Sequence, residues 1–353
     1  MNRIARNAIG IAVLLTYFTL VPTTIGQDAA LESYESLVQR VNRLEESQQQ
    51  LPAAANCNAG GRYFTIETVV VEPRFNTNVA GTIHDTGLLG AGETSFTHDF
   101  SSQLKISPRV EMGYAPQADE WGYRARFWHF QHDSNAWMVG DDIEVNFADD
   151  PDIAIDDNGL GITASQRTQL DVLDLDRTTR ADIGGLSILG GGGLRYANIE
   201  HNANWSDNQS TGERAFISNE FQGFGPSIFM EASKSVNCKR GLFLKARTSL
   251  LAGQQDLLLH STRTFGNGPD DVIEVSNENG IMPVVEMQLG TSFARELPIG
   301  RVECSLAWET QAWFNAGVAA ANESGGKDSD DFQVQRTANM MLNGFNVGVS
   351  LKR

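Results

Sequence analysis

Apolar and polar residues alternate along most of the chain. In "QLKISPRVEMGY", residues 103–114, Ile106 and Met112 fall on one face of an extended chain and Lys105 and Arg109 on the other. This period of two predicts β-strands with one apolar and one polar face. Four further segments repeat the pattern: residues 121–127, 241–253, 283–293 and 302–314.

Less regular segments of the same kind fill the gaps: residues 62–73, 166–177, 186–199, 217–235 and 338–353. Together these segments predict about ten strands. One of them, "RTQLDVLDLDR", loses its alternation after Val172. We therefore expect a β-bulge or a misplaced strand boundary at that point.

The links between the predicted strands are short and long in strict alternation. The short links are residues 115–120, 178–185, 235–241 and 295–300, and the long links are residues 74–102, 133–165, 200–216, 261–281 and 315–337. Short turns at one rim and long loops at the other are typical of bacterial outer-membrane barrels. Lipid offers no partner to an open sheet edge, so such a sheet closes on itself. The predicted fold is all-β: a closed antiparallel transmembrane β-barrel of about ten strands.

A secreted soluble β-sandwich is the alternative, because its strands alternate in the same way. Two features favour the barrel. Aromatic residues lie near the strand ends on the apolar face, as in a membrane girdle: Tyr114, Trp121, Phe127, Trp308 and Phe314. The opposite face carries charged residues along its length, as a barrel lumen does.

The first part of the chain differs from the rest. Residues 1–26 combine Arg3 and Arg6 with an apolar run and small residues near a cleavage point, which predicts a secretory signal peptide. Residues 27–51 carry a short heptad helix, which either pairs with a second copy as a coiled coil or remains a solvated leader. Residues 52–61 read as a linker, and residues 62–353 as the barrel.

Charge is concentrated in the predicted long loops. The formal net charge is −17, which argues against nucleic acid as a partner. The link 133–165 holds nine acidic residues and no lysine or arginine. Its acidic outer loop comprises Asp141, Asp142, Glu144, Asp149, Asp150, Asp152, Asp156 and Asp157. The spacing lacks the pattern of a calcium loop, so we interpret it as a solvated loop rather than a metal site.

The polar faces of the predicted strands define candidate lumen residues. They are Lys105, Arg109, Glu111, Arg124, Arg126, Arg195, Glu231, Lys245, Arg247, Glu286, Glu303 and Glu309. Two hypotheses follow. Arginine and glutamate walls on different sides of the lumen would screen passing solutes in a transverse field. Alternatively, the same side chains pair and plug a narrow interior.

Catalytic and cofactor motifs are not apparent. The run "LGGGGL", residues 189–194, lies within a predicted strand and lacks a phosphate-binding lysine. No nucleophile, zinc-protease or paired-cysteine motif is found, and we predict neither an enzyme nor a cofactor. The three cysteines, Cys57, Cys238 and Cys304, allow at most one internal disulfide, with Cys57–Cys238 as one candidate.

The segment "MLNGFNVGVSLKR", residues 341–353, reads as a strand that closes the barrel by pairing with the first. Asn346, Gly348 and Leu351 fit an assembly signal for the barrel-assembly machinery, although Arg353 stands where an aromatic residue is expected. The predicted partners are therefore outer-membrane lipid, that machinery and, through the heptads, a second copy.

Several segments follow one another in a recognisable order: the leader with its heptad helix, "WGYRARFWHF", "LDVLDLD", "LSILGGGGLRYANIE", "FQGFGPSIFMEAS", "VEMQLGTSFA", "SLAWETQAWFNAG" and "LNGFNVGVSL". Together they resemble the Legionella-type major outer-membrane protein family. The resemblance covers most of residues 62–353 and implies an exported, porin-like barrel in the outer membrane without catalytic residues. The expected function is passive passage of small solutes. A structural or adhesive surface barrel with a plugged lumen and acidic display loops is the alternative.

Overall fold

A computed structural model describes eleven ranges of the chain: residues 60–75, 79–86, 93–101, 103–118, 120–139, 143–144, 161–207, 214–237, 239–265, 268–317 and 338–353. The predicted signal peptide and heptad helix lie outside these ranges, as do Cys57, Cys238 and the acidic loop residues other than Glu144. Within the described ranges, no helix has the length and apolar content that a membrane crossing requires.

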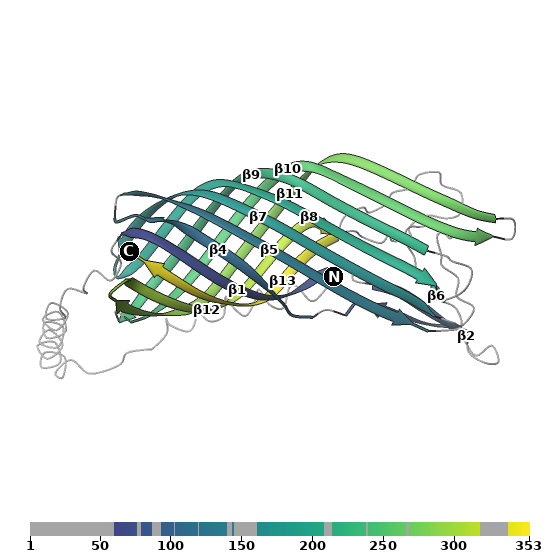
Figure 1. Cartoon of the computed structure of the whole chain (residues 1–353), viewed down its shortest axis with the longest axis horizontal. Coiled ribbons are helices and arrows are strands. Elements are labelled where there is room, and N and C mark those ends of the chain that lie inside the picture. The colour runs from purple at the N-terminus through teal and green to yellow at the C-terminus, as the bar shows by residue number, and fades with distance from the viewer. Residues whose placement is uncertain are drawn as a thin grey trace, which may run out of the picture. The chain divides into compact units, whose positions relative to one another are not determined.

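Ten strands form one closed antiparallel barrel (Figure 1). They are β1 (Gly61–Phe75), β4 (Lys105–Ala115), β5 (Trp121–Met138), β7 (Ile162–Ile183), β8 (Leu186–Asp207), β9 (Arg214–Asn237), β10 (Arg240–Phe265), β11 (Gly268–Leu297), β12 (Gly300–Gly317) and β13 (Ala338–Lys352). The barrel order is β1-β13-β12-β11-β10-β9-β8-β7-β5-β4. The predicted all-β barrel of about ten strands is confirmed.

The last strand closes the barrel against the first, as the sequence predicts. β13 pairs with β1 in one register from Tyr63↔Lys352 to Phe75↔Met340. The short turns β4–β5, β7–β8, β9–β10 and β11–β12 lie at the same rim as the end of β13 (Figure 1). We name it the turn rim. In the β7–β8 turn, Gly184 and Gly185 both have positive φ, which two-residue hairpin turns demand.

Three predicted long loops are wrong, because strands occupy much of them; one is 200–216, where β8 runs to Asp207 and β9 begins at Arg214. β10 and β11 remain paired to Phe265↔Gly268, so the expected loop 261–281 is largely a hairpin that extends far from the turn rim (Figure 1). β5 continues to Met138 and β7 begins at Ile162, which shortens the expected loop 133–165. A small second sheet is formed by β2 (Val79–Thr86), β3 (Glu93–Asp99) and β6 (Ile143–Glu144).

The bulge predicted after Val172 is also wrong. β7 pairs without a register shift both with β5, from Trp121↔Thr179 to Met138↔Ile162, and with β8. The side chains keep their alternation while the two faces exchange character. Leu170 and Val172 are buried towards the lumen, and so are Asp174 and Asp176 that follow. The alternation "lost" in the sequence is therefore a change of environment along a regular strand.

The same exchange follows one row of cross-strand partners over six strands. The last apolar outward row is Phe127↔Leu173↔Tyr196↔Phe224↔Ala252↔Ile281. The next outward row, one step farther from the turn rim, is His129↔Asp171↔Asn198↔Gln222↔Gln254↔Asn279. We name the wall between the turn rim and the apolar row the belt section, and the wall beyond it the outer section.

The belt section carries large apolar side chains on its outside. Outward residues such as Ile66, Leu175, Val285, Leu306 and Val349 are all exposed although apolar. Their partners in alternation face the lumen and are mostly polar or charged. An exposed apolar band around a closed sheet is what a transmembrane barrel presents to lipid.

Candidate functional site: a charged network across the lumen

Charged side chains fill the lumen of the belt section and pair with one another. Six cations take part: Arg109, Arg124, Arg126, Arg195, Lys245 and Arg247. Seven carboxylates take part: Glu67, Glu111, Asp174, Asp176, Glu231, Glu286 and Glu309. We name these thirteen residues the lumen network. Its charges nearly balance, as buried charge requires.

Arg109 on β4 joins three strands in the first part of the network. Its Nη1 and Nη2 donate to the two carboxylate oxygens of Glu309 on β12, each at 2.8 Å. Its Nε donates to Glu67 on β1 at 2.5 Å. Arg109 and Glu309 are almost fully buried, at 1% and 0% exposure. A two-pronged guanidinium–carboxylate pair is among the strongest polar contacts in proteins, so this bridge fixes the lumen locally.

Amide side chains complete the coordination of the two glutamates. Asn346 on β13 donates to Glu67 at 3.1 Å and to Glu309 at 3.2 Å. Gln288 and Gln311 donate to Glu309 at 2.9 Å and 2.6 Å. Both oxygens of Glu309 and Oε2 of Glu67 thus accept hydrogen bonds, and Lys245 Nζ lies 3.9 Å from Glu67 Oε1, which offsets the cost of burying the two charges.

Asp174 on β7 is the centre of the second part. Arg126 and Arg195 donate to it through their Nε atoms, both at 2.7 Å, and Arg247 Nη1 lies 3.2 Å away. Glu286 on β11 contacts Arg126 at 2.8 Å and Arg195 at 2.7 Å. Two carboxylates therefore hold three guanidinium groups from β5, β8 and β10 together.

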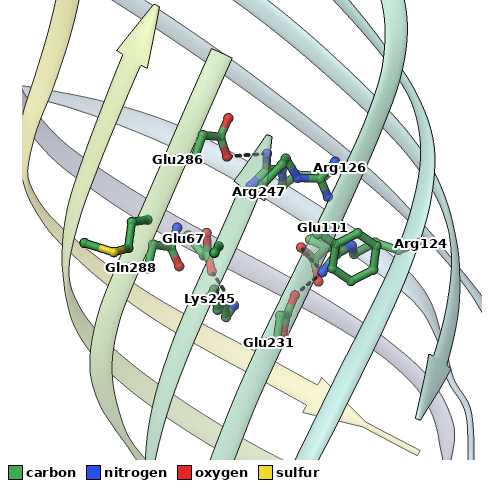
Figure 2. A pocket seen from close by; sticks show the side chains of 12 residues that line it. Glu67, Glu111, Arg124, Arg126, Glu231, Lys245, Arg247, Glu286 and Gln288 are labelled. Carbon is green, nitrogen blue, oxygen red and sulfur yellow. Dashed lines mark hydrogen bonds and ion pairs between the residues drawn. The ribbon is translucent and has the colours of Figure 1, made fainter. Parts of the chain in front are cut away.

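The third part lies around Arg124 on β5. This side chain donates to Asp176 at 2.9 Å and pairs with Glu231, and its guanidinium lies 3.8 Å from the centre of the Phe229 ring. Asp176 also accepts from Arg247 at 2.5 Å. Figure 2 shows Arg124 and Glu231 pointing toward each other, with Glu111 beside them.

The backbone of β8 makes room for these groups. Gly193 lies where an added Cβ would stand 2.8 Å from an Asp176 carboxylate oxygen and 1.9 Å from the Leu175 carbonyl. The predicted glycine run therefore lies within a strand, as expected, and leaves space for a network carboxylate.

Little empty space remains between the network residues. The cavity that they line, shown in Figure 2, has a volume of about 30 Å³. That is room for one or two water molecules. Exposure differs within the network: the side chains of Lys245 and Glu231 are 31% and 19% exposed, whereas those of Asp174 and Arg195 are fully buried.

Beyond the network, the lumen of the outer section turns apolar. Buried side chains from many strands pack there into one cluster, which we name the lid: Val69, Val71, Phe75, Trp128, Phe130, Leu170, Val172, Ala197, Ile199, Phe221, Leu251, Met282, Val284, Trp313, Ala316, Ala338, Met340 and Leu342. A second apolar cluster follows it, with Met138, Ile162 and Trp205 among its members. Both fill the barrel as an ordinary protein core does.

A polar layer contains two buried histidines of the outer section. His201 shares hydrogen bonds with Thr168 Oγ1 at 2.9 Å and Gln166 Nε2 at 3.1 Å, and its ring lies 4.4 Å from that of Phe75. Burial lowers the pKa of His201 to about 4, with a further contribution from His132. Burial, and then Lys105, lower the pKa of His132. Both rings are therefore neutral at pH 7.

Ten of the twelve candidate lumen residues lie in the network. Lys105, opposite Val71, and Glu303, near the turn rim, form none of its ion pairs in the described structure. Sequence reasoning missed Glu67, Asp174 and Asp176. The alternation signals them, because Ile66, Leu173 and Leu175 face outward beside them. Asn346, predicted as part of an assembly signal, also contacts the network.

Other candidates lie elsewhere. Glu144 falls in the small sheet as the partner of Thr82. Cys304, a free thiol, and Leu351 lie on the outward face of their strands. His129 Nδ1 is 2.7 Å from Asp171, but this pair is outside the barrel. The described residues contain no group of three potential metal ligands.

Comparisons with known proteins place the chain. Solved structures similar to it include the protease OmpT from Escherichia coli (11% identity, 83% of this chain, 97% of that chain, TM-score 0.41). The P. putida toluene transporter TodX is another, with 10% identity over 83% of this chain and 90% of that chain and a TM-score of 0.32. A third is the translocator domain of the autotransporter NalP from Neisseria meningitidis, with 10% identity over 91% of this chain and 96% of that chain and a TM-score of 0.28.

No curated protein sequence matches the chain significantly. A family model does: that of the Legionella pneumophila major outer membrane protein precursor, over residues 56–353. This match spans most of the chain and agrees with the closed barrel and its apolar belt. The chain therefore belongs to the Legionella pneumophila major outer membrane protein family and is an outer-membrane β-barrel.

Proposed function

We propose that this protein is a plugged surface barrel: its belt section lies in the outer membrane, its outer section is displayed beyond the membrane, and it does not act as an open passive pore. The bridge from Arg109 to Glu309 and Glu67 carries the proposal, because it joins β4, β12 and β1 across the lumen with almost complete burial. The lid supports it further. A solute would have to displace both the paired charges and a close-packed apolar cluster.

The outer section is the part that such a barrel displays. On the outside of the barrel it carries acidic side chains: Glu72, Asp133, Asp171, Glu200, Glu220 and Asp256. The described basic residues on that surface are Arg74, Arg167 and Arg214. An acidic surface attracts cations and cation-bridged polymers at the cell exterior. We infer a structural or adhesive role, without catalysis.

Gated passage is the second candidate, and the exposure within the network favours it. Lys245, Glu231 and Glu111 are partly exposed, so the lumen admits solvent from the turn rim up to the network. Paired charges also cost more to bury than apolar side chains of the same size. A network kept despite that cost is consistent with an element that opens.

Conductance in planar bilayers separates the two candidates. We expect no current steps from refolded wild-type protein, and none from Glu309→Gln, because the lid still closes the lumen. Arg167→Gln, on the outer surface, is the matched control. Steady steps from wild type at low voltage would contradict the plugged barrel. Brief openings that become frequent in Glu309→Gln but not in Arg167→Gln would favour gated passage.

A further inference from the structure

Basic side chains surround the turn rim on the lipid-facing side of the wall. Six strands end there with an outward-facing cation, and we name these six the basic rim: Arg62, Arg177, Lys234, Arg240, Arg295 and Arg353. All six are exposed. In a chain whose formal net charge is −17, this is a local reversal of sign.

Each cation of the basic rim continues the apolar belt. Arg62 is one outward step beyond Phe64, Arg240 one step beyond Leu242, and Arg295 one step beyond Phe293. Arg177, Lys234 and Arg353 stand in the same relation to Leu175, Ala232 and Leu351. The basic groups therefore lie where lipid tails give way to headgroups.

Carboxylates are not found in this position among the described residues. Asp182, Glu296 and Glu303 lie near the same rim. They occupy the positions of their strands that face the lumen, one residue away from outward-facing side chains. Glu296 forms an ion pair at 3.4 Å with Arg301, which is also at a lumen-facing position of its strand. Glu120, in the β4–β5 turn, accepts a hydrogen bond from Tyr114 Oη at 3.5 Å, so one carboxylate does lie near the outward aromatic side chains. Among the described residues, the outward-facing charges on the strands at this rim are all positive.

Aromatic neighbours hold part of the basic rim at the interface. The Arg177 guanidinium lies 3.9 Å from the centre of the Trp121 ring, and Trp121 is 61% exposed. Tyr114 and Tyr123 stack beside it, and Tyr114 is the cross-strand partner of Arg62. Tryptophan and tyrosine favour the headgroup level of a bilayer. An arginine held beside such rings can donate charge-assisted hydrogen bonds to a lipid phosphate group.

We propose that the basic rim binds the headgroups of anionic glycerophospholipids in the periplasmic leaflet of the outer membrane. The short turns of outer-membrane barrels face the periplasm, which assigns the rim to that leaflet. Basic residues near an anionic bilayer surface each strengthen binding about fivefold. Six in a ring select anionic over zwitterionic lipid and fix the depth of the barrel.

Lipid retention in native mass spectrometry tests the proposal. The full chain is refolded and offered an equimolar mixture of phosphatidylglycerol and phosphatidylcholine in detergent. Wild type should retain mainly phosphatidylglycerol. The triple variant Arg177→Gln, Arg240→Gln, Arg295→Gln removes three of the six cations and should lower the ratio of retained phosphatidylglycerol to phosphatidylcholine by about 100-fold. Heat-modifiable gel migration verifies that each variant is folded.

The matched control removes three charges from the opposite end: Arg74→Gln, Arg167→Gln, Arg214→Gln. It should keep the wild-type lipid ratio. The proposal is overturned if the rim variant keeps that ratio, or if both triple variants lose it equally. If the rim triple fails to fold, Arg295→Gln alone should lower the ratio by about fivefold. A rim variant that loses sedimentation with peptidoglycan sacculi but keeps its lipid ratio would instead identify the cell wall as the partner.

Discussion

The belt section and the outer section are built from the same strands in the same register, yet their faces are reversed. In the belt section the outside is apolar and the lumen charged. In the outer section the outside is mostly polar, with Trp137 as an exposed exception, and the lumen is mostly apolar. A strand leaving lipid for water meets the opposite solvent on its outer face, and its inner face becomes an ordinary core. The reversal therefore marks the membrane boundary.

The two interiors are held together by different forces. The lumen network depends on directional pairs, and loss of one partner leaves a buried charge uncompensated. The lid depends on packing, where the loss of a side chain is graded by its volume. The substitutions below separate these cases, in order of the expected effect.

The largest effect is expected in the network. Asp174→Asn removes the anion that contacts Arg126, Arg195 and Arg247, and should lower the free energy of unfolding by about 3–5 kcal/mol. Urea unfolding from lipid vesicles, followed by tryptophan fluorescence, measures it. Asp133→Asn, at an exposed pair with Arg167, is the control and should change it by less than about 0.5 kcal/mol. Equal losses in the two variants would refute the network's role.

The next effect is expected in the lid. Phe130 is fully buried against Trp128, with the ring centres 5.9 Å apart. Phe130→Ala should cost about 3 kcal/mol through the lost contacts and the remaining cavity. Gln131→Ala, on the outer face of the same strand, should be nearly neutral in the same urea titration. A neutral Phe130→Ala would mean that the lid is not close-packed.

A third comparison places an arginine on the outward face of each section. Val347 is 50% exposed in the belt section, and Val347→Arg should cost about 2–4 kcal/mol because it places charge in lipid. Asn279→Arg, in the first polar row, should cost less than about 0.5 kcal/mol because that side chain is exposed on a hydrated face. Unfolding from vesicles gives both values. Similar losses in the free energy of unfolding at the two positions would mean that both face the same environment, which contradicts a membrane boundary between them.

The smallest effect concerns pH. The folded-state pKa of His201, about 4, is below its ordinary value, so the unfolded chain binds the proton more readily. The resulting stabilisation is complete above pH 6.5 and is lost as the pH falls toward 4, on the order of 2 kcal/mol between pH 8 and pH 5. The opening free energy of the outer section, obtained from amide hydrogen exchange after correction for the intrinsic exchange rate at each pH, should fall over this window in wild type and less in His201→Gln. The same fall in both proteins would exclude His201 as the cause.

How much of this follows from sequence depends on the section. In the belt section, where period two is combined with one apolar face, strands such as 283–293 are found where they are predicted. In the outer section the same rule fails. The loop predicted at 261–281 is largely a hairpin, and polar outward residues such as Gln254 and Asn279 break the apolar face from which strands were predicted. "LDVLDLD" looks irregular because it crosses the boundary between the two sections.

The pairing inside the lumen is a second limit. Alternation indicates that Arg109 and Glu309 face inward, but the two residues are 200 positions apart. Which charges meet depends on barrel closure and on strand register around all ten strands. Sequence therefore predicts the composition of the lumen, and only the structure distinguishes opposed walls from paired ones.

Site-directed spin labelling along β7 tests the reversal most directly. Single labels at Gln169, Asp171, Leu173 and Leu175, in a background without the native cysteines, are exposed to lipid-soluble oxygen and to a water-soluble nickel complex. We predict that the labels at Leu173 and Leu175 collide mainly with oxygen and those at Gln169 and Asp171 mainly with nickel. Oxygen contact at all four positions, or outward-facing labels at Val172 and Asp174, would contradict the account.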